Sequence, residues 1–545
     1  MNKYRFLFLL ILGLSISACS DLEEEPVGLL SPEAYFTDLA SLQNSVNAVY
    51  TYVHDRPFLV REAGMAIMLR GDMVKISDPG TRQERIDHDE FTDLDDNGNT
   101  TYAWPNIWQI VASSNLAIDG ARLLAESGNV DQSAIDPVVA EAYFLRAFVY
   151  YHIVRQFGSV PYLTEPVSDV EAGSNVEKTP VADIYAGIIS DLTFAKANLP
   201  NQVSNRALAS KAAASAYLAS VHLTMGSYQA AFDEAEDVID NAGVYDLALD
   251  DDYQNLWRYD MVNASKEPIF NLDYIGNVGI GDPNTDYIGP LSGIRAATNY
   301  PQNNGWAVLA TSVEVYNRWD GQDYRRAVSI DTTAVFEIGA ADTPTEVRFD
   351  QVPVLSDGNP IQDADGNNLV GWNALDARNH SGQPFIAKYN RFLGSDFGGS
   401  GRASEQNYHM MRYAEVLLIA AEAAVEINND GAAVNYLNQV RSRAQLAGSN
   451  SVDPAIQTKY PVSASPALHG GGVTVDEVLE ERRLELAFEM KRWYDIVRRD
   501  LGNTANGDVF GAGGLEGAKA NFNAVDDYLI AIPAAEVARN PNLGN

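Results

Sequence analysis

Hydrophobic and polar residues follow two different patterns along this chain. Residues 30–250 and 406–500 are rich in alanine and leucine, and their apolar positions recur at the three- and four-residue spacing of amphipathic helices. Residues 251–405 instead hold glycine, asparagine, aspartate, tyrosine and tryptophan in short runs. The pattern predicts a mainly α fold, in which an N-terminal helical scaffold (31–250) and a C-terminal helical part (406–545) flank an irregular, loop-rich lobe (251–405).

Two segments of the helical parts are typical of tetratricopeptide-like helix pairs. Residues 212–242 place small and apolar side chains around a turn at Gly226, and residues 414–440 do the same around a turn at 429–431. Stacked pairs of this kind bury a continuous seam and leave a concave surface. Unrelated helical hairpins in an all-α fold are the alternative interpretation. Helical spacing is also present from Trp104 to Asn115 and through residues 141–151.

The lobe carries turn signals and scattered aromatic residues. Asp-Gly pairs at 357–358 and 365–366 supply the left-handed turns of hairpins. The aromatic residues lie among glycine and asparagine, and rings on loops stack on the flat C–H faces of neutral sugars. Loop rings also fill small cores, which is the alternative interpretation. The residues concerned are Trp257, Tyr259, Tyr274, Tyr287, Tyr300, Trp306 and Trp372.

The N-terminus has the anatomy of a bacterial lipoprotein signal. Lys3 and Arg5 precede an apolar run at residues 6–14, and a small-residue box at 16–19 ends in Cys19, the only cysteine of the chain. We therefore expect a signal peptide at 1–18, a lipid on Cys19 and an acidic, flexible tether at 19–30. An ordinary buried thiol behind a signal sequence is the alternative. The apolar run is far below the ~20 residues that span a bilayer, and no later run is longer, so no membrane-spanning helix is predicted.

Composition narrows the set of partners. The formal net charge is −36, and such a field repels nucleic acid and anionic lipid, because both bind through clustered lysine and arginine. Neither is expected as a main partner. A polyanionic ligand is compatible with this charge only if basic residues such as Arg82, Arg85 and Arg295 converge. A single cysteine allows no intrachain disulfide, so the fold has to depend on its hydrophobic core or on bound ions.

No motif indicates catalysis or a cofactor. Residues 93–98 match the opening of a calcium-binding loop, but position twelve is Trp104 instead of a bidentate glutamate, so a solvated acidic turn is the preferred interpretation. The seven histidines show no metal-binding spacing, and neither a G-x-S-x-G elbow nor a Walker loop occurs. A glycoside hydrolase needs a pair of carboxylates, and the 74 acidic residues are too many for a count to exclude such a pair. The glycoside hydrolase therefore stays an alternative. We expect a non-enzyme without a cofactor, and calcium bound at residues 93–98 is the alternative.

Seven sequence blocks, in order, resemble one family. The chain is similar, nearly end to end, to the SusD/RagB glycan-binding lipoproteins of Bacteroidetes outer membranes. The blocks are residues 19–26, residues 104–108 with Asn115, residues 141–147 with 158–161, residues 411–418, residues 437–444, residues 481–489 with 492–495, and residues 532–533 with 540–542.

The resemblance implies a fold of about four tetratricopeptide-like helix pairs that support a ligand-binding lobe. It also implies a surface-exposed lipoprotein of the outer membrane that captures oligosaccharide or polysaccharide and delivers it to a SusC-like TonB-dependent transporter. In the family the ligand site draws on the loop before the W-x-x-I helix and on the irregular lobe, here residues 70–93 and 287–306. The glycan-binding residues expected from the resemblance are Asp72, Asp78, Arg82, Phe91, Tyr287, Tyr300 and Trp306.

The blocks also have a plain structural interpretation. Within residues 481–498, Leu484, Phe488 and Ile496 share one helical stripe with Glu485 and Arg492 near it. A partly buried ion network that joins helices is therefore expected there instead of a catalytic site. Three functional hypotheses follow: a glycan-binding protein that feeds a transporter, which is preferred, a surface glycoside hydrolase, and a tetratricopeptide scaffold that binds peptide or protein cargo.

Overall fold

The computed structural model describes most of the chain after residue 30. Helices dominate the described residues, so the expected mainly α fold is confirmed. No helix among them is both long enough and apolar enough to cross a bilayer. The described residues are 31–167, 169–258, 261, 263–274, 286–295, 305–338, 343–354, 358–362, 365–371, 382–389, 406–450, 463–515, 517 and 519–544.

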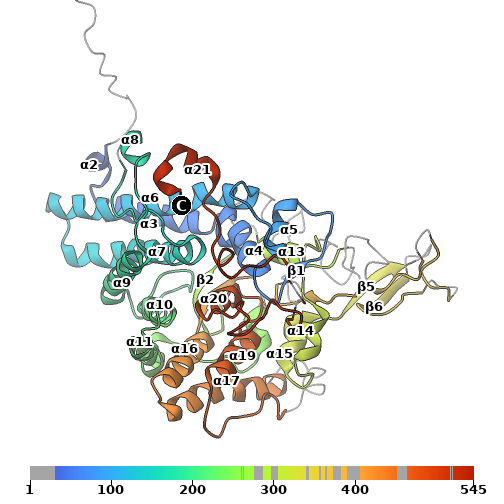
Figure 1. The fold of residues 1–545 in the computed structure, drawn as a ribbon. Coiled ribbons are helices and arrows are strands. Elements are labelled where there is room, and N and C mark those ends of the chain that lie inside the picture. The colour runs from blue at the N-terminus through green and yellow to red at the C-terminus, as the bar shows by residue number, and fades with distance from the viewer. Residues whose placement is uncertain are drawn as a thin grey trace, which may run out of the picture.

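Helices that pack as four consecutive pairs form the scaffold (Figure 1). The second helix of each pair contacts the first helix of the next, so the pairs follow one another through the molecule as they do along the chain. The expectation of about four tetratricopeptide-like pairs is confirmed. The pairs are α3 (Leu39–Val53) with α6 (Gly98–Ser127), α7 (Gln132–Phe157) with α9 (Val181–Asn198), α10 (Lys211–Thr224) with α11 (Tyr228–Asp240), and α16 (Tyr413–Glu426) with α17 (Asp430–Asn450).

Capped ends and left-handed turn residues define the two hairpins predicted from sequence. Ser210 caps α10 by accepting a hydrogen bond from the Ala213 amide. Gly226, at φ +73°, supplies the left-handed residue that separates α10 from α11. Between α16 and α17 the left-handed residue is Asn428, at φ +61°, whereas Gly431 lies inside the first turn of α17.

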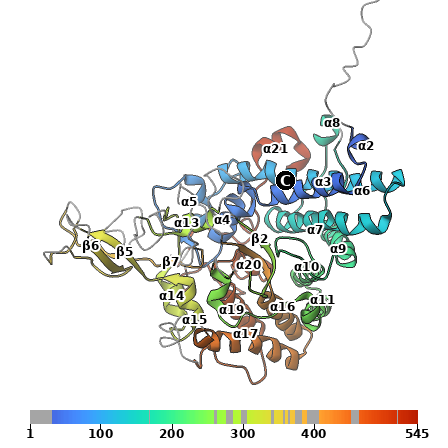
Figure 2. The same cartoon turned by 180° about the vertical axis from the view of Figure 1, so that it is seen from behind.

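Small antiparallel sheets occupy the irregular lobe. Among the described residues, one sheet has the strand order β1–β3–β7–β4, and two further sheets pair β2 with β8 and β5 with β6. The strands are β1 (Lys75–Ile76), β2 (Pro268–Leu272), β3 (Leu309–Ala310), β4 (Ile330–Asp331), β5 (Thr333–Ile338), β6 (Thr343–Arg348), β7 (Phe385–Ile386) and β8 (Tyr408–Arg412). The β5–β6 ribbon projects from the body of the molecule (Figures 1 and 2). The predicted left-handed turn glycines are confirmed at Gly358 and Gly366, which have φ +83° and +84°.

Short helices cover the sheets and the ends of the scaffold. They are α2 (Pro32–Tyr35), η1 (Arg56–Val60), α4 (Glu62–Leu69), α5 (Gln83–Glu90), α8 (Val170–Gly173), α12 (Ala242–Tyr245), η2 (Tyr253–Trp257), α13 (Ile288–Ser292), α14 (Val313–Arg318), α15 (Tyr324–Ser329), α19 (Val475–Glu485), α20 (Arg492–Arg498), α21 (Ala534–Arg539) and η6 (Pro541–Leu543). Both views place α4, α5 and α13 together near β1, away from α2 and α8 and on the side of the molecule from which the β5–β6 ribbon projects (Figures 1 and 2).

A buried ion network ties the C-terminal helices to the lobe. Glu485, at the end of α19, accepts hydrogen bonds from Arg325 and Arg412 over 2.8 and 2.6 Å, and a third from Arg443. Burial alone would raise the pKa of Glu485, but Arg443, Arg412 and Arg325 outweigh it and hold the pKa well below its usual range. The ion network predicted within residues 481–498 is confirmed, but the single helical stripe predicted for Leu484, Phe488 and Ile496 is wrong. The chain leaves helical geometry between α19 and α20, where Phe488 and Met490 have φ of +67° and +60°.

Candidate functional site

Arginine and aromatic side chains from separate segments contact one another. They belong to the region where the ribbons of α4, α5 and α13 lie close together (Figures 1 and 2). The segments are the connection between α3 and α4, the turn that leads into α5, the start of α6, and residues around α13. We call this group the arginine–aromatic patch. Its members are Arg56, Arg61, Arg82, Arg85, Tyr102, Tyr287, Arg295 and Trp306.

A backbone kink brings two arginines onto one ring. The chain leaves helical geometry at Phe58, where ψ is −131°, and α4 starts in a new direction. Arg56 and Arg61 flank Tyr287, with their guanidinium carbons 5.8 and 5.1 Å from the ring centroid. Arg56 also lies 5.3 Å from the ring centroid of Tyr102 and donates a hydrogen bond to its hydroxyl. Cation–π contacts therefore hold both positive charges in place.

Solvent reaches two aromatic rings of the patch. Tyr102 is 46% exposed at the start of α6. Trp306 is half-buried, with its ring centroid 6.0 Å from that of Tyr287. Tyr287 is only 3% exposed, so it supports its neighbours instead of offering a ring face to a ligand. The accessible surface thus combines the rings of Tyr102 and Trp306 with guanidinium groups.

The turn before α5 places three further arginines. The Thr81 amide donates to the Asp78 carbonyl oxygen over 3.0 Å, and the Thr81 hydroxyl oxygen accepts a hydrogen bond from Arg85 over 3.1 Å. The Asp78 carboxylate lies 3.6 Å from Arg295. Arg82 is the N-cap residue of α5, and its side chain is 55% exposed. The basic residues whose convergence a polyanionic ligand requires are therefore gathered at one turn.

Charge repulsion within the patch acts on Arg85. Burial lowers the pKa of Arg85, and the positive charges of Arg61 and Arg82 lower it further, to about 10. The group is still protonated at neutral pH. The patch therefore presents concentrated positive charge on a chain whose formal net charge is −36.

The structure brings together four of the residues predicted to bind glycan. Asp78, Arg82, Tyr287 and Trp306 come from two distant segments and lie in or beside the patch. Asp78 and Tyr287 are buried, whereas Arg82 and Trp306 are accessible. Their role in binding stays a prediction.

Asp72 and Phe91, also predicted to bind glycan, lie in the interior. Asp72 is 1% exposed and accepts two hydrogen bonds from Arg492, over 2.8 and 2.7 Å. Phe91 is 5% exposed, and its ring centroid lies 6.0 Å from Trp493 and 5.2 Å from Phe510. Both residues join the 70–93 segment to the C-terminal part of the chain, so packing accounts for them in this structure.

The remaining predicted residues fall outside the described part of the chain. Cys19 and Tyr300 belong to this group, as do Tyr259 and Trp372 among the aromatic residues of the lobe. The other two lobe aromatics, Trp257 and Tyr274, are buried. Their burial agrees with the alternative interpretation, in which loop rings fill a core.

Sequence reasoning missed Arg56, Arg61 and Tyr102. An Arg-Pro pair at 56–57 interrupts an otherwise helical region, which is a signal of a kink. Tyr102 lies outside the apolar stripe that begins at Trp104, which is a signal of exposure. Neither signal reveals that these residues meet Tyr287, because only the fold brings the two segments together.

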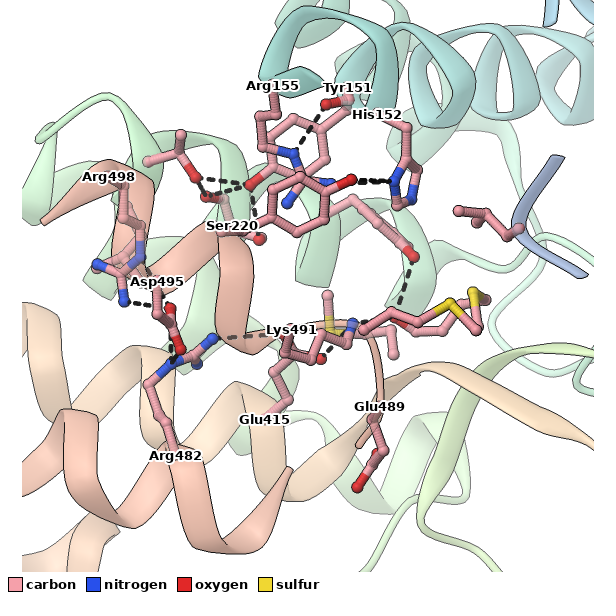
Figure 3. Close-up of a pocket in the computed structure, with 18 residues that line it drawn as sticks. Tyr151, His152, Arg155, Ser220, Glu415, Arg482, Glu489, Lys491, Asp495 and Arg498 are labelled. Atoms are coloured by element: carbon pink, nitrogen blue, oxygen red, sulfur yellow. Dashed lines mark hydrogen bonds and ion pairs between the residues drawn. The ribbon is translucent and has the colours of Figure 1, made fainter. Parts of the chain in front are cut away.

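The charged cavity in Figure 3 is part of the core. It lies between α7, α10, α16 and the segment from α19 to α20, where Arg482, Asp495 and Arg498 point toward one another. Lys491 lies 2.8 Å from Glu415, and Arg482 lies 3.0 Å from Asp495, so these charges are paired. The cavity measures about 30 Å³, which is room for one or two water molecules. It is far too small for a sugar ring.

The acidic turn at 93–98 is used structurally. Asp93 accepts a hydrogen bond from Arg70 over 2.7 Å and lies 3.6 Å from His88. Asn97 caps α6 by accepting hydrogen bonds from the amides of the two residues at 99 and 100. Within the described ranges, no group of three or more histidine, cysteine, aspartate or glutamate residues is arranged to hold a metal ion.

The fold defines a helical-repeat protein that carries an arginine–aromatic patch. Comparison with known families assigns it further: residues 266–545 match the SusD family, and residues 37–223 match a family described as starch-binding and associating with the outer membrane. SusD-like protein P2 of Formosa agariphila is 42% identical to this chain, over 100% of this chain and 99% of that protein. A SusD-like protein of Bacteroides ovatus is 23% identical, over 91% of this chain and 82% of its own length. The chain belongs to the SusD family.

Solved structures show the same fold. A SusD homologue from Bacteroides thetaiotaomicron superposes with a TM-score of 0.73 at 20% identity, and the match covers 94% of this chain and 97% of the homologue. A laminarin-binding SusD-like protein superposes with a TM-score of 0.69 at 22% identity, over 92% of this chain and 98% of that one. SusD-family proteins bind glycans without catalysis, so the expectation of a non-enzymatic glycan-binding protein is confirmed.

Proposed function

We propose that this protein captures oligosaccharide or polysaccharide at the arginine–aromatic patch and delivers it to a SusC-like TonB-dependent transporter of the outer membrane. One observation carries the proposal: Tyr102 and Trp306 offer accessible rings on the same surface as the guanidinium group of Arg56. A pyranose ring can stack on such faces while guanidinium groups donate hydrogen bonds to its hydroxyls. The laminarin named for one structural relative supports a glycan as the ligand.

The lipid anchor belongs to the same proposal. A diacylglycerol on Cys19 would hold the protein at the outer membrane, since each buried acyl methylene contributes ~0.8 kcal/mol. The acidic residues at 19–30 would then separate the folded body from the headgroups on the exterior side. Support comes from the signal-like sequence before Cys19 and from the outer-membrane association in the description of the matched family.

Substitution of the two accessible rings tests the binding site. Tyr102→Ala and Trp306→Ala should each weaken binding to the best glycan of a polysaccharide panel by about tenfold, because each removes a stacking face. Affinity electrophoresis of the full chain in mild detergent measures this. Tyr35→Ala is the matched control, since Tyr35 is 39% exposed on α2, which lies away from α4, α5 and α13 (Figure 1). Binding that survives both patch substitutions would place the site elsewhere.

Gentle detergent extraction tests the partnership. The native lipoprotein should co-purify with a large β-barrel protein, and a Cys19→Ala variant should lose its lipid and leave the membrane fraction. Recovery of the native protein only as a free lipoprotein would argue against the transporter. Release of reducing sugar by the purified protein would argue against a pure binding role.

A further inference from the structure

The arginines of the patch indicate which class of glycan it binds, and this inference rests on the proposed function. The chain has 38 basic and 74 acidic residues, so it is strongly acidic as a whole. Five guanidinium groups nevertheless meet in the patch. They belong to Arg56, Arg61, Arg82, Arg85 and Arg295.

Carboxylates pair with some of these arginines. Each pair lies within the patch or at its edge. In each pair the negative charge of the carboxylate offsets most of the positive charge of its arginine. The pairs are Arg61 with Glu62 (2.6 Å), Arg82 with Glu84 (3.1 Å) and Arg295 with Asp78 (3.6 Å).

Arg56 and Arg85 make no close ion pair with a carboxylate in the described part of the chain, although the Glu62 and Glu84 carboxylates act on Arg85 at longer range. The Arg56 guanidinium contacts the Tyr102 hydroxyl and two ring faces, and Arg85 donates to the Thr81 hydroxyl oxygen. The neighbouring Asp55 carboxylate accepts the backbone amide of Arg56, not its guanidinium. The Nε atoms of both arginines are buried and make no hydrogen bond with any described residue. A buried positive group left in this state is stabilised when an anion approaches it.

The packing of these arginines suits an anionic ligand. A guanidinium group binds carboxylate and sulfate oxygens through two parallel hydrogen bonds, which a lysine cannot reproduce. Because Arg56 is already held against the rings of Tyr102 and Tyr287, less side-chain freedom is lost on binding. Arg85 is 9% exposed, so its charge acts at short range with little screening by solvent.

We propose that the patch selects glycans that carry carboxylate or sulfate groups. Arg56 and Arg85 bind the anionic group, while Tyr102 and Trp306 stack on the sugar ring. The attraction is local, because the acidic remainder of the chain repels anions and salt screens exposed charges beyond ~8 Å at physiological ionic strength. The carboxylate and the sulfate ester share this chemistry, and binding measurements distinguish them.

A paired glycan array tests the proposal. The full lipoprotein, in mild detergent, is applied to carboxylated and sulfated oligosaccharides, each printed beside its methyl-esterified or desulfated counterpart. We expect binding to at least one charged member at about tenfold or more above its neutral counterpart, with a decline as salt rises. Binding to neutral members that charge does not improve would overturn this inference and leave the proposed function intact. Failure to bind any glycan would overturn the proposed function as well.

Arginine variants assign the selectivity to residues. Arg56→Gln and Arg85→Gln should each reduce affinity for the charged glycan by about tenfold or more, and should reduce affinity for the neutral counterpart by a smaller factor, so that the ratio of charged to neutral affinity falls. Arg56→Lys should give an intermediate value, since it keeps the charge and loses the planar fork. Arg122→Gln is the control, because Arg122 is 55% exposed and pairs with Asp119 on a distant part of α6.

Thermal unfolding of each variant separates loss of binding from loss of fold. Should the largely buried Arg85→Gln substitution unfold the protein, the Arg56 variants decide the matter. A folded Arg56→Gln protein with an unchanged ratio of charged to neutral affinity would overturn the proposal.

Discussion

At the scale of single residues, buried charge holds the scaffold and the lobe together. Glu485 is fully buried and accepts hydrogen bonds from three arginines that come from α15, β8 and α17. Removal of one partner from such a group leaves buried charge uncompensated, which costs more than the pair contributes in isolation. Glu480, on the exposed face of α19, does not join several buried arginines in this way.

The Glu485→Gln substitution should lower the free energy of unfolding by about 3–5 kcal/mol, because three buried guanidinium groups lose their common counter-charge. Glu480→Gln on the same helix should change it by less than about 1 kcal/mol, since the Glu480 side chain is 52% exposed and its close ion pair is with Arg483 on the same helix. Urea unfolding of both variants measures the difference. Equal stability of the two would contradict the structural role given to Glu485.

At the scale of elements, close helix packing depends on where small residues lie. Gly120 lies within α6, and a Cβ placed there would meet the ring of Phe36 at 2.3 Å. Helix propensity favours alanine over glycine at such a position by about 1 kcal/mol. Sterics oppose this preference, so local propensity and tertiary packing make opposite predictions for the same residue.

The Gly120→Ala substitution should destabilise the protein by about 1–3 kcal/mol, since overpacking outweighs the gain in helix propensity. Gly431→Ala in the first turn of α17 is the matched control, because nothing lies within 4 Å of a Cβ at that position. It should be neutral or stabilising by up to about 1 kcal/mol. Differential scanning calorimetry shows whether each substitution raises or lowers the stability of the protein. A Gly120→Ala protein more stable than the native one would show that Phe36 moves aside without cost.

At the scale of the whole molecule, surface and interior respond to acid in opposite directions. The chain carries a formal charge of −36, so protonation of exposed carboxylates relieves repulsion as pH falls. In the interior, burial would raise the pKa of Glu489 and Asp495, but Arg412 and Lys388 around the first, and Arg482 and Arg498 around the second, hold both below their usual range.

A carboxylate with a depressed folded pKa contributes stability above its unfolded pKa and loses it as pH falls toward the folded value. The free energy of unfolding should therefore drop steeply below about pH 4.5, once interior carboxylates begin to protonate on unfolding. Urea unfolding between about pH 7 and pH 3 measures this loss of stability. In the Glu485→Gln variant the free energy of unfolding should fall less steeply with decreasing pH, because the variant lacks one of these carboxylates. Stability that kept rising down to about pH 3 would mean that surface repulsion dominates instead.

Sequence alone determined the features that depend on neighbours along the chain. The helices around Trp104 and Asn115, the turn at Gly226, the left-handed Gly358 and Gly366 and the family itself all follow from local spacing and order, because helix period and turn geometry are short-range properties. The ion network within residues 481–498 also followed, since charged residues among buried apolar ones have to pair, whereas the break between α19 and α20 did not follow.

Tertiary structure decided which side chains form the surface of the candidate site. Phe91 and Trp306 are both aromatic residues in irregular segments, yet one packs in the core against Trp493 and the other lies half-buried in the patch. Arg56 contacts Tyr287 only because the fold places the kinked segment between α3 and α4 against the lobe. Contacts between distant segments depend on how whole elements pack, and no local pattern encodes the direction in which an irregular segment turns its side chains.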